Sequence, residues 1–530
     1  MTTQNGLFGH ARSPSRPSFV AIELFLGCVG IACGTPSEGG SSGGSGSGNA
    51  GTSGQSGGGG ATGSGGHAAS GGVDSGGHAG ATTDAATMDA RGADSDAPPS
   101  NRGCAANLPR VLPFDPQRAQ RGEAMFRSMP LATGILPEIA VRALWLTWGV
   151  LPPATDQDFW TQARKRYGMI EAPFDNGGLP LGMRRDGAAV TFDCMLCHTG
   201  RVAGKTLIGS PNSTIDLESF FDDLLRLRDL APVVGIPPPP VPFDLDGFTS
   251  AVGAHDAFGL GFRFVGAANA GLNTKFGPQR APGWWLLHYK ERMYVDGSAQ
   301  ASGHRSMMAT LVAFGVTPDQ LAAKEDSFVD IAHYIRSLET PCWDFTTLDA
   351  SKMSRGQKVF EANCARCHGV HSGPDARYPN NVIALTEVGT DPMRAQRFRA
   401  QEAAALSASW FGVPPFQSTG GYLSQPLVGI WARAPYFHNG SVPDLMAVLD
   451  PTKRPTRWRR VGTGGELSDY DVERVGFRYE EVSTPSDPST REGRLVYDTT
   501  REGMSNAGHT FGASLTDVER SDLLEYLRGL

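Results

Sequence analysis

The sequence predicts a mainly α-helical protein with two domains in tandem, interrupted by long loop insertions and preceded by a disordered segment. Three observations predict this arrangement. The pentapeptide Cys-x-x-Cys-His occurs twice, at 194–198 and at 364–368. Apolar residues recur at helical spacing before the second copy and at the C-terminus. A tract that begins at residue 34 contains little besides Gly, Ser, Ala and Thr.

Each pentapeptide has the spacing that attaches a c-type haem. The two thiols form thioethers to haem vinyl groups, and the adjacent histidine gives its proximal nitrogen to the iron. The histidine directly after the second cysteine, and the repetition, disfavour the alternatives of a redox dithiol or half of a zinc site. We therefore expect two covalently bound haem c groups in two cytochrome c-type domains. The predicted cofactor-binding residues are Cys194, Cys197, His198, Cys364, Cys367 and His368.

The domain around the second pentapeptide is expected to span 341–530. An amphipathic helix is predicted just before Cys364, in the string SRGQKVFEAN. Another is predicted in the C-terminal string SLTDVERSDLLEYLRGL, with Ser514 as its N-cap. Two such helices crossing beside the haem are the usual frame of a c-type domain.

The domain around the first pentapeptide is expected to span 104–340. Residues 120–126 (QRGEAMF) echo residues 354–360 (SRGQKVF), and a closing helix is predicted at 327–338. We interpret the two domains as a divergent repeat. A chance match of the short RG-x-x-x-F string is the alternative.

Residues 1–33 have the layout of a secretory signal, with Arg12 and Arg16 before an apolar run that ends at Cys33. Two interpretations stay open: a lipoprotein signal acylated at Cys33, and cleavage by ordinary signal peptidase. We expect a periplasmic or cell-envelope location, lipid-anchored in the first case, with an extracellular location as an alternative. No later apolar run is long enough to span a bilayer.

Residues 34–103 cannot bury enough apolar surface to offset the entropy of ordering, so we expect a disordered tether. The net charge of −7 and the pI of about 6.0 give no basic patch, so no nucleic-acid partner is expected. Cys104 and Cys342 remain outside the haem motifs. An oxidising compartment permits a disulfide between them, which stays a hypothesis from sequence alone.

The string LVGIWARAPYFHNGSVPDL at 427–445, above all APYFHNG at 434–440, resembles the di-haem cytochrome c peroxidase superfamily. That superfamily includes the enzyme that matures tryptophan tryptophylquinone and the di-haem rubber oxygenases. The resemblance covers both haem motifs and the C-terminal half, and is weaker over 104–190. The strings at 178–182, 208–212, 389–392 and 505–509 are similar to the rubber-oxygenase-like branch.

The resemblance implies a second axial ligand for the second haem. Typical di-haem peroxidases have a methionine where this chain has Thr452, fourteen positions after His438. Met446 is near, but in a probable helix. The rubber-oxygenase-like pattern ends in a histidine that matches His509, which would pair with His368. Bis-histidine ligation lowers the potential relative to Met/His ligation. A surface role for His509 is the alternative, and a structural role is expected for His438.

The resemblance implies a distal histidine soon after the first motif, but no histidine occurs between 199 and 254, so the sixth position of the first haem is expected to be open or weakly held. O2 or H2O2 would bind there. His304 and Arg305 are candidates for contacting bound oxygen species, with a surface position as the alternative. The resemblance implies a tryptophan between the haems, for which Trp284 and Trp285 are the candidates, with core packing as the alternative.

The leading hypothesis is an exported di-haem oxidoreductase whose first haem reacts with peroxide or O2 and whose second haem transfers electrons. A small redox protein or cytochrome is the expected electron partner. A non-catalytic electron carrier is one alternative. An oxygenase for an apolar substrate is another, with its pocket lined by Phe258, Phe262, Phe264, Phe314 and the tryptophans. Some relatives hold calcium between the domains, so calcium is a further hypothesis.

Overall fold

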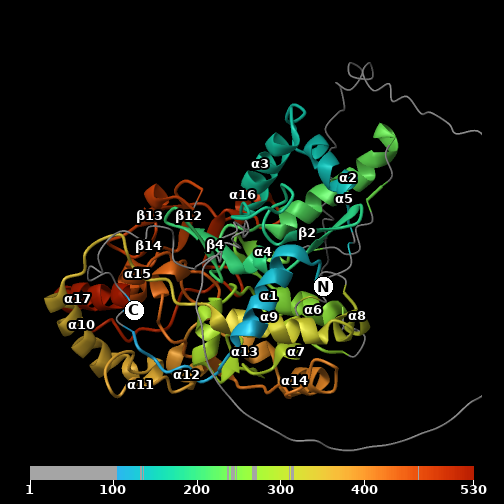
Figure 1. Cartoon of the computed structure of the whole chain (residues 1–530). Coiled ribbons are helices and arrows are strands. Elements are labelled where there is room, and N and C mark those ends of the chain that lie inside the picture. Colours follow the sequence, from blue (N-terminus) through green and yellow to red (C-terminus); the bar gives the residue numbers. More distant parts are fainter. Residues whose placement is uncertain are drawn as a thin grey trace, which may run out of the picture. The chain divides into compact units, whose positions relative to one another are not determined.

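The computed structural model describes residues 104, 106–131, 134, 136–235, 238–239, 245, 247–264, 271–309, 311, 316–463 and 465–530 (Figure 1). The expected signal, the tether and the lipid-anchor candidate Cys33 lie outside the described residues, as do Phe314 and the side chain of Phe264. The described residues belong to one compact unit, in which the expected division near residue 340 stays a prediction. Among them, no helix has the length and apolar character needed to cross a bilayer.

Helices dominate the order of elements, with the strands confined to short two- and three-stranded sheets. The α-helices are α1 Pro116–Ser128, α2 Glu138–Arg142, α3 Asp156–Tyr167, α4 Met195–His198, α5 Leu217–Val234, α6 Ala257–Phe264, α7 His304–Met308, α8 Pro318–Ala322, α9 Glu325–Ser337, α10 Ala350–Asn363, α11 Ala365–His368, α12 Leu385–Val388, α13 Met393–Arg397, α14 Ala400–Ser407, α15 Leu445–Leu449, α16 Arg491–Arg494 and α17 Asp517–Gly529.

The three-stranded antiparallel sheets have the orders β1-β3-β2 and β15-β12-β16, and the other sheets have two antiparallel strands. The strands are β1 Leu136–Pro137, β2 Met183–Asp186, β3 Ala189–Phe192, β4 Thr199–Val202, β5 Lys205–Ile208, β6 Thr249–Ala251, β7 Ala254–His255, β8 Arg292–Met293, β9 Ala299–Gln300, β10 Val382–Ala384, β11 Gly421–Leu423, β12 Arg457–Arg460, β13 Tyr470–Asp471, β14 Gly476–Phe477, β15 Tyr479–Glu481 and β16 Val496–Asp498. In register, Trp458 of β12 faces Glu481 of β15 and Tyr497 of β16.

Helix α1 packs against α9 at a glycine. A Cβ on Gly122 would overlap the backbone carbonyl of Asp330, so only glycine allows this close approach. Beside it, the Arg121 guanidinium donates to both carboxylate oxygens of Asp330, at 2.7 and 3.0 Å. The echo string 120–126 therefore forms the contact face of α1.

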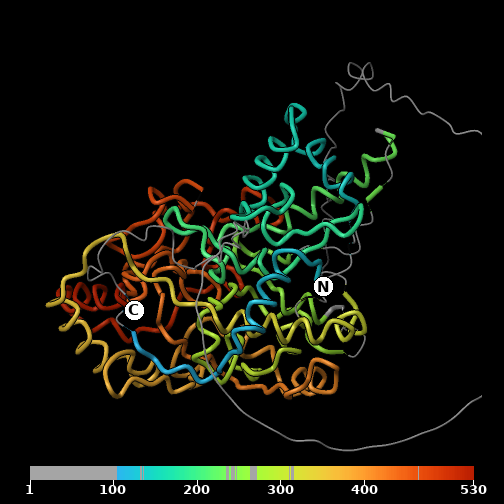
Figure 2. The backbone as a smooth tube through the Cα atoms, viewed as in Figure 1, coloured from blue at the N-terminus to red at the C-terminus, as the bar shows by residue number. Residues whose placement is uncertain are grey.

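Helix α10 packs against α17 in the same manner, and Figure 2 shows the last helix, in red, returning beside α10. A Cβ on Gly356 would overlap the carbonyl of Asp522, and Arg355 donates to the Asp522 carboxylate at 2.7 and 2.8 Å. The helix before Cys364 is thus confirmed. The N-cap of α17 is Thr516, with Glu519 closing a capping box, so the expectation of Ser514 as N-cap was wrong by two residues.

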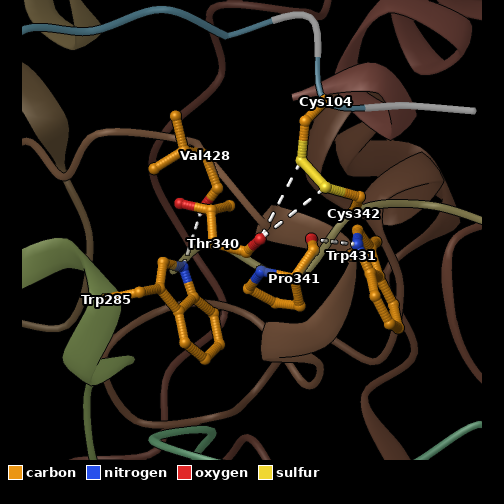
Figure 3. The surroundings of a disulfide bond; sticks show 7 residues. All are labelled: Cys104, Trp285, Thr340, Pro341, Cys342, Val428 and Trp431. Atoms are coloured by element: carbon orange, nitrogen blue, oxygen red, sulfur yellow. Dashed lines mark hydrogen bonds between the residues drawn. A yellow bond between two sulfur atoms is a disulfide. The ribbon is translucent and has the colours of Figure 1, made fainter. Parts of the chain in front are cut away.

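A disulfide joins Cys104 to Cys342, with 5.1 Å between their Cα atoms, which confirms the pairing left open by the sequence (Figure 3). It ties the start of the described chain to the segment between α9 and α10. The adjacent Pro341 carbonyl accepts a hydrogen bond from Trp431 Nε1 at 2.9 Å. The disulfide thus holds this connecting segment to the start of the described chain, and the Trp431 hydrogen bond holds it to the C-terminal half.

Candidate haem sites

The first pentapeptide forms α4, between strands β3 and β4. Cys194, Cys197 and His198 line a cavity of about 220 Å³. His198 Nδ1 lies 3.1 Å from the Pro282 carbonyl oxygen, which can only accept, so Nδ1 carries the proton. Burial lowers the pKa of His198 to about 4, which keeps the imidazole neutral. Nε2 is then available to a metal, and the Pro282 carbonyl orients the ring.

The second pentapeptide forms α11, directly after α10, and holds the thiols of Cys364 and Cys367. His368 Nδ1 lies 2.7 Å from the Gln425 carbonyl oxygen, so its Nε2 is likewise available. The ring of His509 faces that of His368, with 6.1 Å between centroids and 58° between planes. Burial lowers the pKa of His509 to about 3, so it is also neutral.

This separation suits a shared metal ion. Two imidazole–metal bonds of about 2.0 Å each, together with the half-widths of two rings, add up to about the observed centroid distance. The ring atom Nδ1 of His509 is buried and has no hydrogen-bond partner among the described residues, so, unlike in His198 and His368, no protein group fixes the tautomer of this imidazole. The residues at both pentapeptides therefore fit a covalently attached haem.

Three cations that are wholly or partly buried lie beside the two sites: Lys290 is buried, and Arg280 and Arg433 are partly buried. In the described part of the chain they form no ion pair; they donate to the Arg433, Gln425 and Pro426 oxygens respectively. Burial lowers their pKa values to about 9, 7 and 10. Buried cations without carboxylate partners are costly. The carboxylates of haem propionates would supply the missing charge, which is a further fit to the cofactor.

His255, at the end of β7, is a polar residue in the wall of the first cavity. Its side chain is 6 % exposed. Nδ1 is hydrogen-bonded to Thr249 Oγ1 at 3.1 Å, whereas Nε2 has no partner among the described residues. Burial lowers the pKa of His255 to about 4. A neutral imidazole with one unpartnered nitrogen therefore lines the space beside Cys194 and Cys197.

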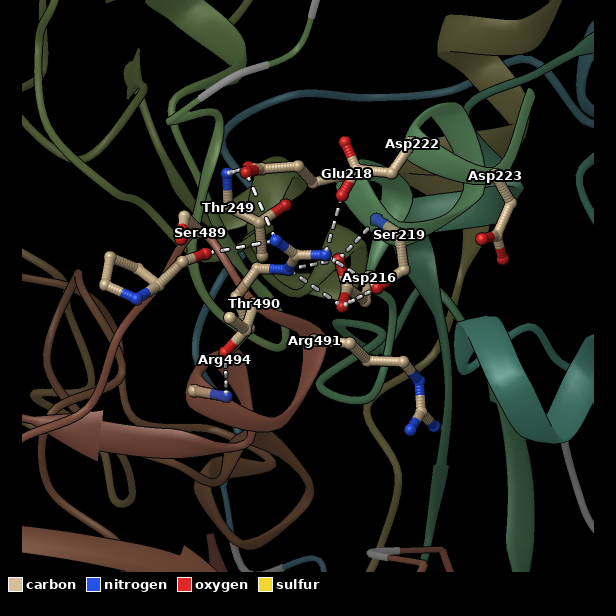
Figure 4. A network of polar contacts seen from close by, with 12 residues as sticks. Asp216, Glu218, Ser219, Asp222, Asp223, Thr249, Ser489, Thr490, Arg491 and Arg494 are labelled. Atoms are coloured by element: carbon tan, nitrogen blue, oxygen red, sulfur yellow. Dashed lines mark hydrogen bonds and ion pairs between the residues drawn. The ribbon is translucent and has the colours of Figure 1, made fainter. Parts of the chain in front are cut away.

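A buried ionic network fixes the hairpin that carries His255 (Figure 4). Arg494 of α16 pairs with Asp216, Glu218 and Asp222 at 3.1–3.3 Å. Glu218 also accepts the backbone N–H of Thr249 at 2.6 Å. Burial raises the pKa of Glu218 to about 7. The network thus connects α5 and the His255 hairpin to the C-terminal half and holds the hairpin in place.

The two tryptophans lie in the 3₁₀-helix η3, Trp284–Tyr289, and both are buried. The Trp284 ring stacks on His198, with 4.9 Å between centroids and 21° between planes. Trp285 Nε1 donates to the Val428 carbonyl at 3.0 Å (Figure 3). Val428 lies three residues after Gln425, whose carbonyl holds His368. Adjacent indoles thus contact the surroundings of both pentapeptides.

Arg305, expected to contact bound oxygen species, lies elsewhere. Its guanidinium pairs with Glu325 at 2.5 and 3.0 Å and stacks over Trp410, and His304 bonds the same carboxylate at 2.7 Å. Neither residue lines the cavity. We therefore leave both out of the proposed site.

The expected phenylalanines and His438 have packing roles. Phe258 and Phe262 belong to an aromatic cluster with Phe276 and Phe398, although Phe258 also reaches the cavity wall. His438 stacks on Tyr422 at 4.3 Å, in keeping with the expected structural role. Within the described ranges, no cluster of three or more acidic, His or Cys side chains could hold a metal ion, and calcium stays a hypothesis.

Sequence reasoning missed His255 and the three cations Arg280, Lys290 and Arg433. None of them belongs to a motif with fixed spacing. Arg280 directly precedes the Ala-Pro-Gly string before the tryptophans, and Arg433 lies within the 427–445 string. Their positions beside recognisable strings were the only available signal.

Comparison with known proteins agrees with this chemistry. A RoxA-like, cytochrome c-like family profile matches residues 421–459, and a cytochrome c profile matches residues 353–415. Two uncharacterised proteins of Sinorhizobium fredii are similar. Protein y4iM is 27 % identical over 257 residues, 43 % of this chain and 56 % of that protein; y4iJ is 25 % identical over 277 residues, 40 % and 44 %. The chain thus spans about half the length of these relatives.

Two solved structures are also similar. A MauG-like protein associated with microbial copper homeostasis is 13 % identical, with a TM-score of 0.31 and coverage of 83 % of this chain and 95 % of that one. A hydrazine synthase of Kuenenia stuttgartiensis is 18 % identical, with a TM-score of 0.23 and coverage of 48 % and 73 %.

The two family profiles lie on the second pentapeptide and on the string that continues from it to β12. Both describe cytochrome c domains, in which haem c is bound covalently through the Cys-x-x-Cys-His motif. Taken with the geometry of the second pentapeptide, they show a cytochrome c domain with covalently bound haem c in the region from residue 353 to residue 459.

Proposed function

We propose that this chain is an exported oxidoreductase with two covalent haem c groups, in tandem domains at 104–340 and 341–530. The matching helix pairs support the tandem arrangement. Gly122 and Gly356 make the same close approach to a partner helix, and the preceding arginine pairs with an aspartate in both cases. A chance match of the RG-x-x-x-F string gives no reason for two equivalent ion pairs.

The observation that carries the proposal is the difference between the two proximal histidines. His368 has a second imidazole, His509, facing it at 6.1 Å. Among the described residues the ring in contact with His198 is that of Trp284, and the histidine in the wall of its 220 Å³ cavity, His255, is not in ring contact with it. Two imidazoles hold one iron in six-coordinate form, whereas a single imidazole leaves a coordination position for a small oxidant.

The second haem, between His368 and His509, is proposed to transfer electrons. His368 and His509 would hold this haem from both sides, so no exogenous ligand would be needed there. Bis-histidine ligation gives a lower potential than the Met/His ligation of typical di-haem peroxidases, in which this haem stores an electron. The chain has Thr452 where such a methionine would stand, which is consistent with this difference.

The first haem is proposed as the centre that reacts with H2O2 or O2, and the iron supplies the redox chemistry when the group is bound. His255 would offer its unpartnered Nε2 to the cavity. The Arg494 network holds the His255 hairpin in place, and the Pro282 carbonyl holds His198. Largely apolar walls, including Phe258 and Leu260, would keep bulk water out.

Electrons are proposed to pass between the haems through Trp284 and Trp285, because their indoles contact the surroundings of both proximal histidines. A small redox protein or cytochrome would supply or accept electrons outside the molecule. The N-terminal signal pattern supports a periplasmic or cell-envelope location, with Cys33 as the candidate lipid anchor.

Two other functions make different demands on the first cavity. A plain electron carrier requires a second protein ligand opposite His198. An oxygenase for an apolar substrate requires space for that substrate. The apolar lining of the cavity, which includes Phe258 and Met293, favours an apolar substrate over a polar one. Both are tested by the same experiment.

The test uses purified holoprotein. A pyridine haemochrome assay is expected to give two haems per chain, and carbon monoxide is expected to bind one of the two reduced haems. With H2O2 added, the holoprotein should then oxidise a reduced small cytochrome over many turnovers. Two haems without any carbon monoxide binding would instead establish an electron carrier. Oxygen uptake in the presence of polyisoprene, without oxidation of the cytochrome by H2O2, would establish the oxygenase.

A further inference from the structure

The loop that carries His509 has a backbone that needs support. His509 has a φ of +46° and Gly508 a φ of +76°. A non-glycine residue in this left-handed region costs free energy and persists only where the surrounding structure holds it. No helix or strand includes residues 505–510. Contacts from other segments must therefore fix the imidazole.

Arg454 supplies three of these contacts. Its Nη1 donates to the carbonyl oxygens of Asn506 and Gly508, both at 2.7 Å, and its Nη2 donates to the His509 carbonyl at 3.1 Å. Three carbonyls of the loop thus converge on a single guanidinium.

The same guanidinium is anchored to a helix. Nε donates to the Ala447 carbonyl at 2.9 Å and Nη2 donates to the Val448 carbonyl at 3.2 Å, both in α15. A guanidinium has five N–H donors in a fixed plane, and five carbonyls accept from Arg454. The ring of Phe437 lies 5.0 Å from the guanidinium and 5.9 Å from the His509 ring, which packs the two side chains together.

The opposite side of the loop rests on the end of α12. The His509 backbone N–H donates to the Val388 carbonyl at 2.6 Å, and a Cβ on Gly508 would overlap the backbone of Gly389. The strings 389–392 and 505–509, far apart in sequence, meet here. Asn439, Ser441 and Asp391 hold Ser505 at the start of the loop, so without Arg454 the carbonyls of Gly508 and His509 would lose their donor.

We propose that Arg454 is a positioning residue that keeps His509 facing His368; this rests on the proposed role of His509 as an iron ligand. Arg454 touches no reacting group. Its loss leaves five carbonyls without their common donor and lets the His509 backbone leave its left-handed conformation. The imidazole then moves away, and the second haem becomes accessible to exogenous ligands.

The experiment compares Arg454→Gln, Arg454→Lys and His509→Ala in the full-length holoprotein, with Arg459→Gln as control. Arg459 lies on the same segment, but is half exposed and paired with Glu480. The readouts are the amplitude of the low-spin EPR signal of the second haem and its recovery on adding imidazole. Haem content and circular dichroism identify folded samples.

Arg454→Gln is expected to raise the fraction of five-coordinate second haem roughly tenfold or more. A change of this size corresponds to the free energy stored in one strained backbone conformation. In Arg454→Lys the five-coordinate fraction should lie between those of Arg454→Gln and the wild type, because an ammonium group has three donors and lacks the planar arrangement of a guanidinium. Imidazole should restore the low-spin signal in the folded variants, and Arg459→Gln should match the wild type. These results would support the proposal.

Two results would overturn it separately. If His509→Ala turns the second haem high-spin while Arg454→Gln keeps it low-spin, Arg454 is not needed and the inference is wrong, although the ligand assignment stands. If His509→Ala leaves that haem low-spin, the ligand assignment itself fails. Equal loss of signal in Arg454→Gln and Arg459→Gln would also count against a specific role.

Discussion

The imidazoles of His368 and His509 face each other with 6.1 Å between their centroids, although 141 positions separate them in the sequence. Each proximal histidine has its Nδ1 proton held by a carbonyl, that of Pro282 for His198 and that of Gln425 for His368. The two sites therefore share their proximal design and differ on the side opposite it. That difference divides the proposed work between the haems.

Replacing His509 by methionine should keep the second haem six-coordinate and raise its midpoint potential, because thioether ligation favours the reduced iron. Spectroelectrochemical titration measures the change. His304→Met serves as control, since His304 bonds Glu325 away from the cavity. An unchanged potential in His509→Met would mean that residue 509 does not ligate the iron.

Replacing Trp285 by phenylalanine should slow electron exchange between the haems. The variant loses the hydrogen bond from Nε1 to the Val428 carbonyl and part of the ring that adjoins Trp284. Flash photolysis of the carbon monoxide complex, followed at both haems, measures the rate. Trp410→Phe is the control, because Trp410 packs on Arg305. If electron exchange between the haems is equally fast in Trp285→Phe and Trp410→Phe, Trp285 serves only to pack the core.

Replacing Gly356 by alanine should destabilise the fold by about 1–3 kcal/mol, because the new methyl group overlaps the carbonyl of Asp522 where α10 crosses α17. Denaturant unfolding measures the loss. Gly261→Ala in α6 is the matched control: its Cβ has its nearest neighbour at 3.5 Å, and alanine gains up to about 1 kcal/mol in helix propensity. Similar effects at both sites would contradict the close packing of the two helices.

Replacing Arg355 by glutamine should destabilise the protein in a pH-dependent way. Hydrogen bonding to Arg355 lowers the pKa of Asp522 below its usual 3.8, so the pair contributes stability above that pH and loses it as the pH falls through the native pKa. The variant should be less stable at pH 7, because the Asp522 carboxylate loses its donor. The difference should shrink below pH 3.8. A constant difference across this range would contradict the pairing.

Removing the disulfide by Cys104→Ser with Cys342→Ser should lower the free energy of unfolding by about 2–4 kcal/mol, since the bond closes a long loop. The haem spectrum should not change, because neither cysteine lies in a haem motif. Thiol titration of the denatured wild type should find two more reactive thiols after reduction. The same count with and without reductant would show that the bond does not form.

The motifs with fixed spacing were predictable from sequence, because local chemistry dictates them. Strings of a few residues were enough to predict the two pentapeptides and the helix before Cys364. The same holds for the two helix pairs, one built on Gly122 and the other on Gly356. His509 was found through its resemblance to a family string. The disulfide was predictable only as a pairing of two leftover cysteines, since sequence gives no distance between them.

The remaining features depend on contacts between distant segments. His255 becomes part of the first cavity because β7 pairs with the segment at Gln279, and Arg454 reaches the His509 loop from the segment between α15 and β12. Arg305 was misjudged for the same reason: its neighbour in sequence is a histidine, but its partner in space is Glu325. No periodicity or spacing in the sequence encodes such partners.

Low-temperature EPR of the oxidised holoprotein tests the central claim most directly, since it distinguishes the coordination of two haems in a single spectrum. The account predicts one high-spin ferric signal, abolished by cyanide, from the haem at His198, and one low-spin signal, unchanged by cyanide, from the haem at His368 and His509. Two low-spin signals that both ignore cyanide would contradict it.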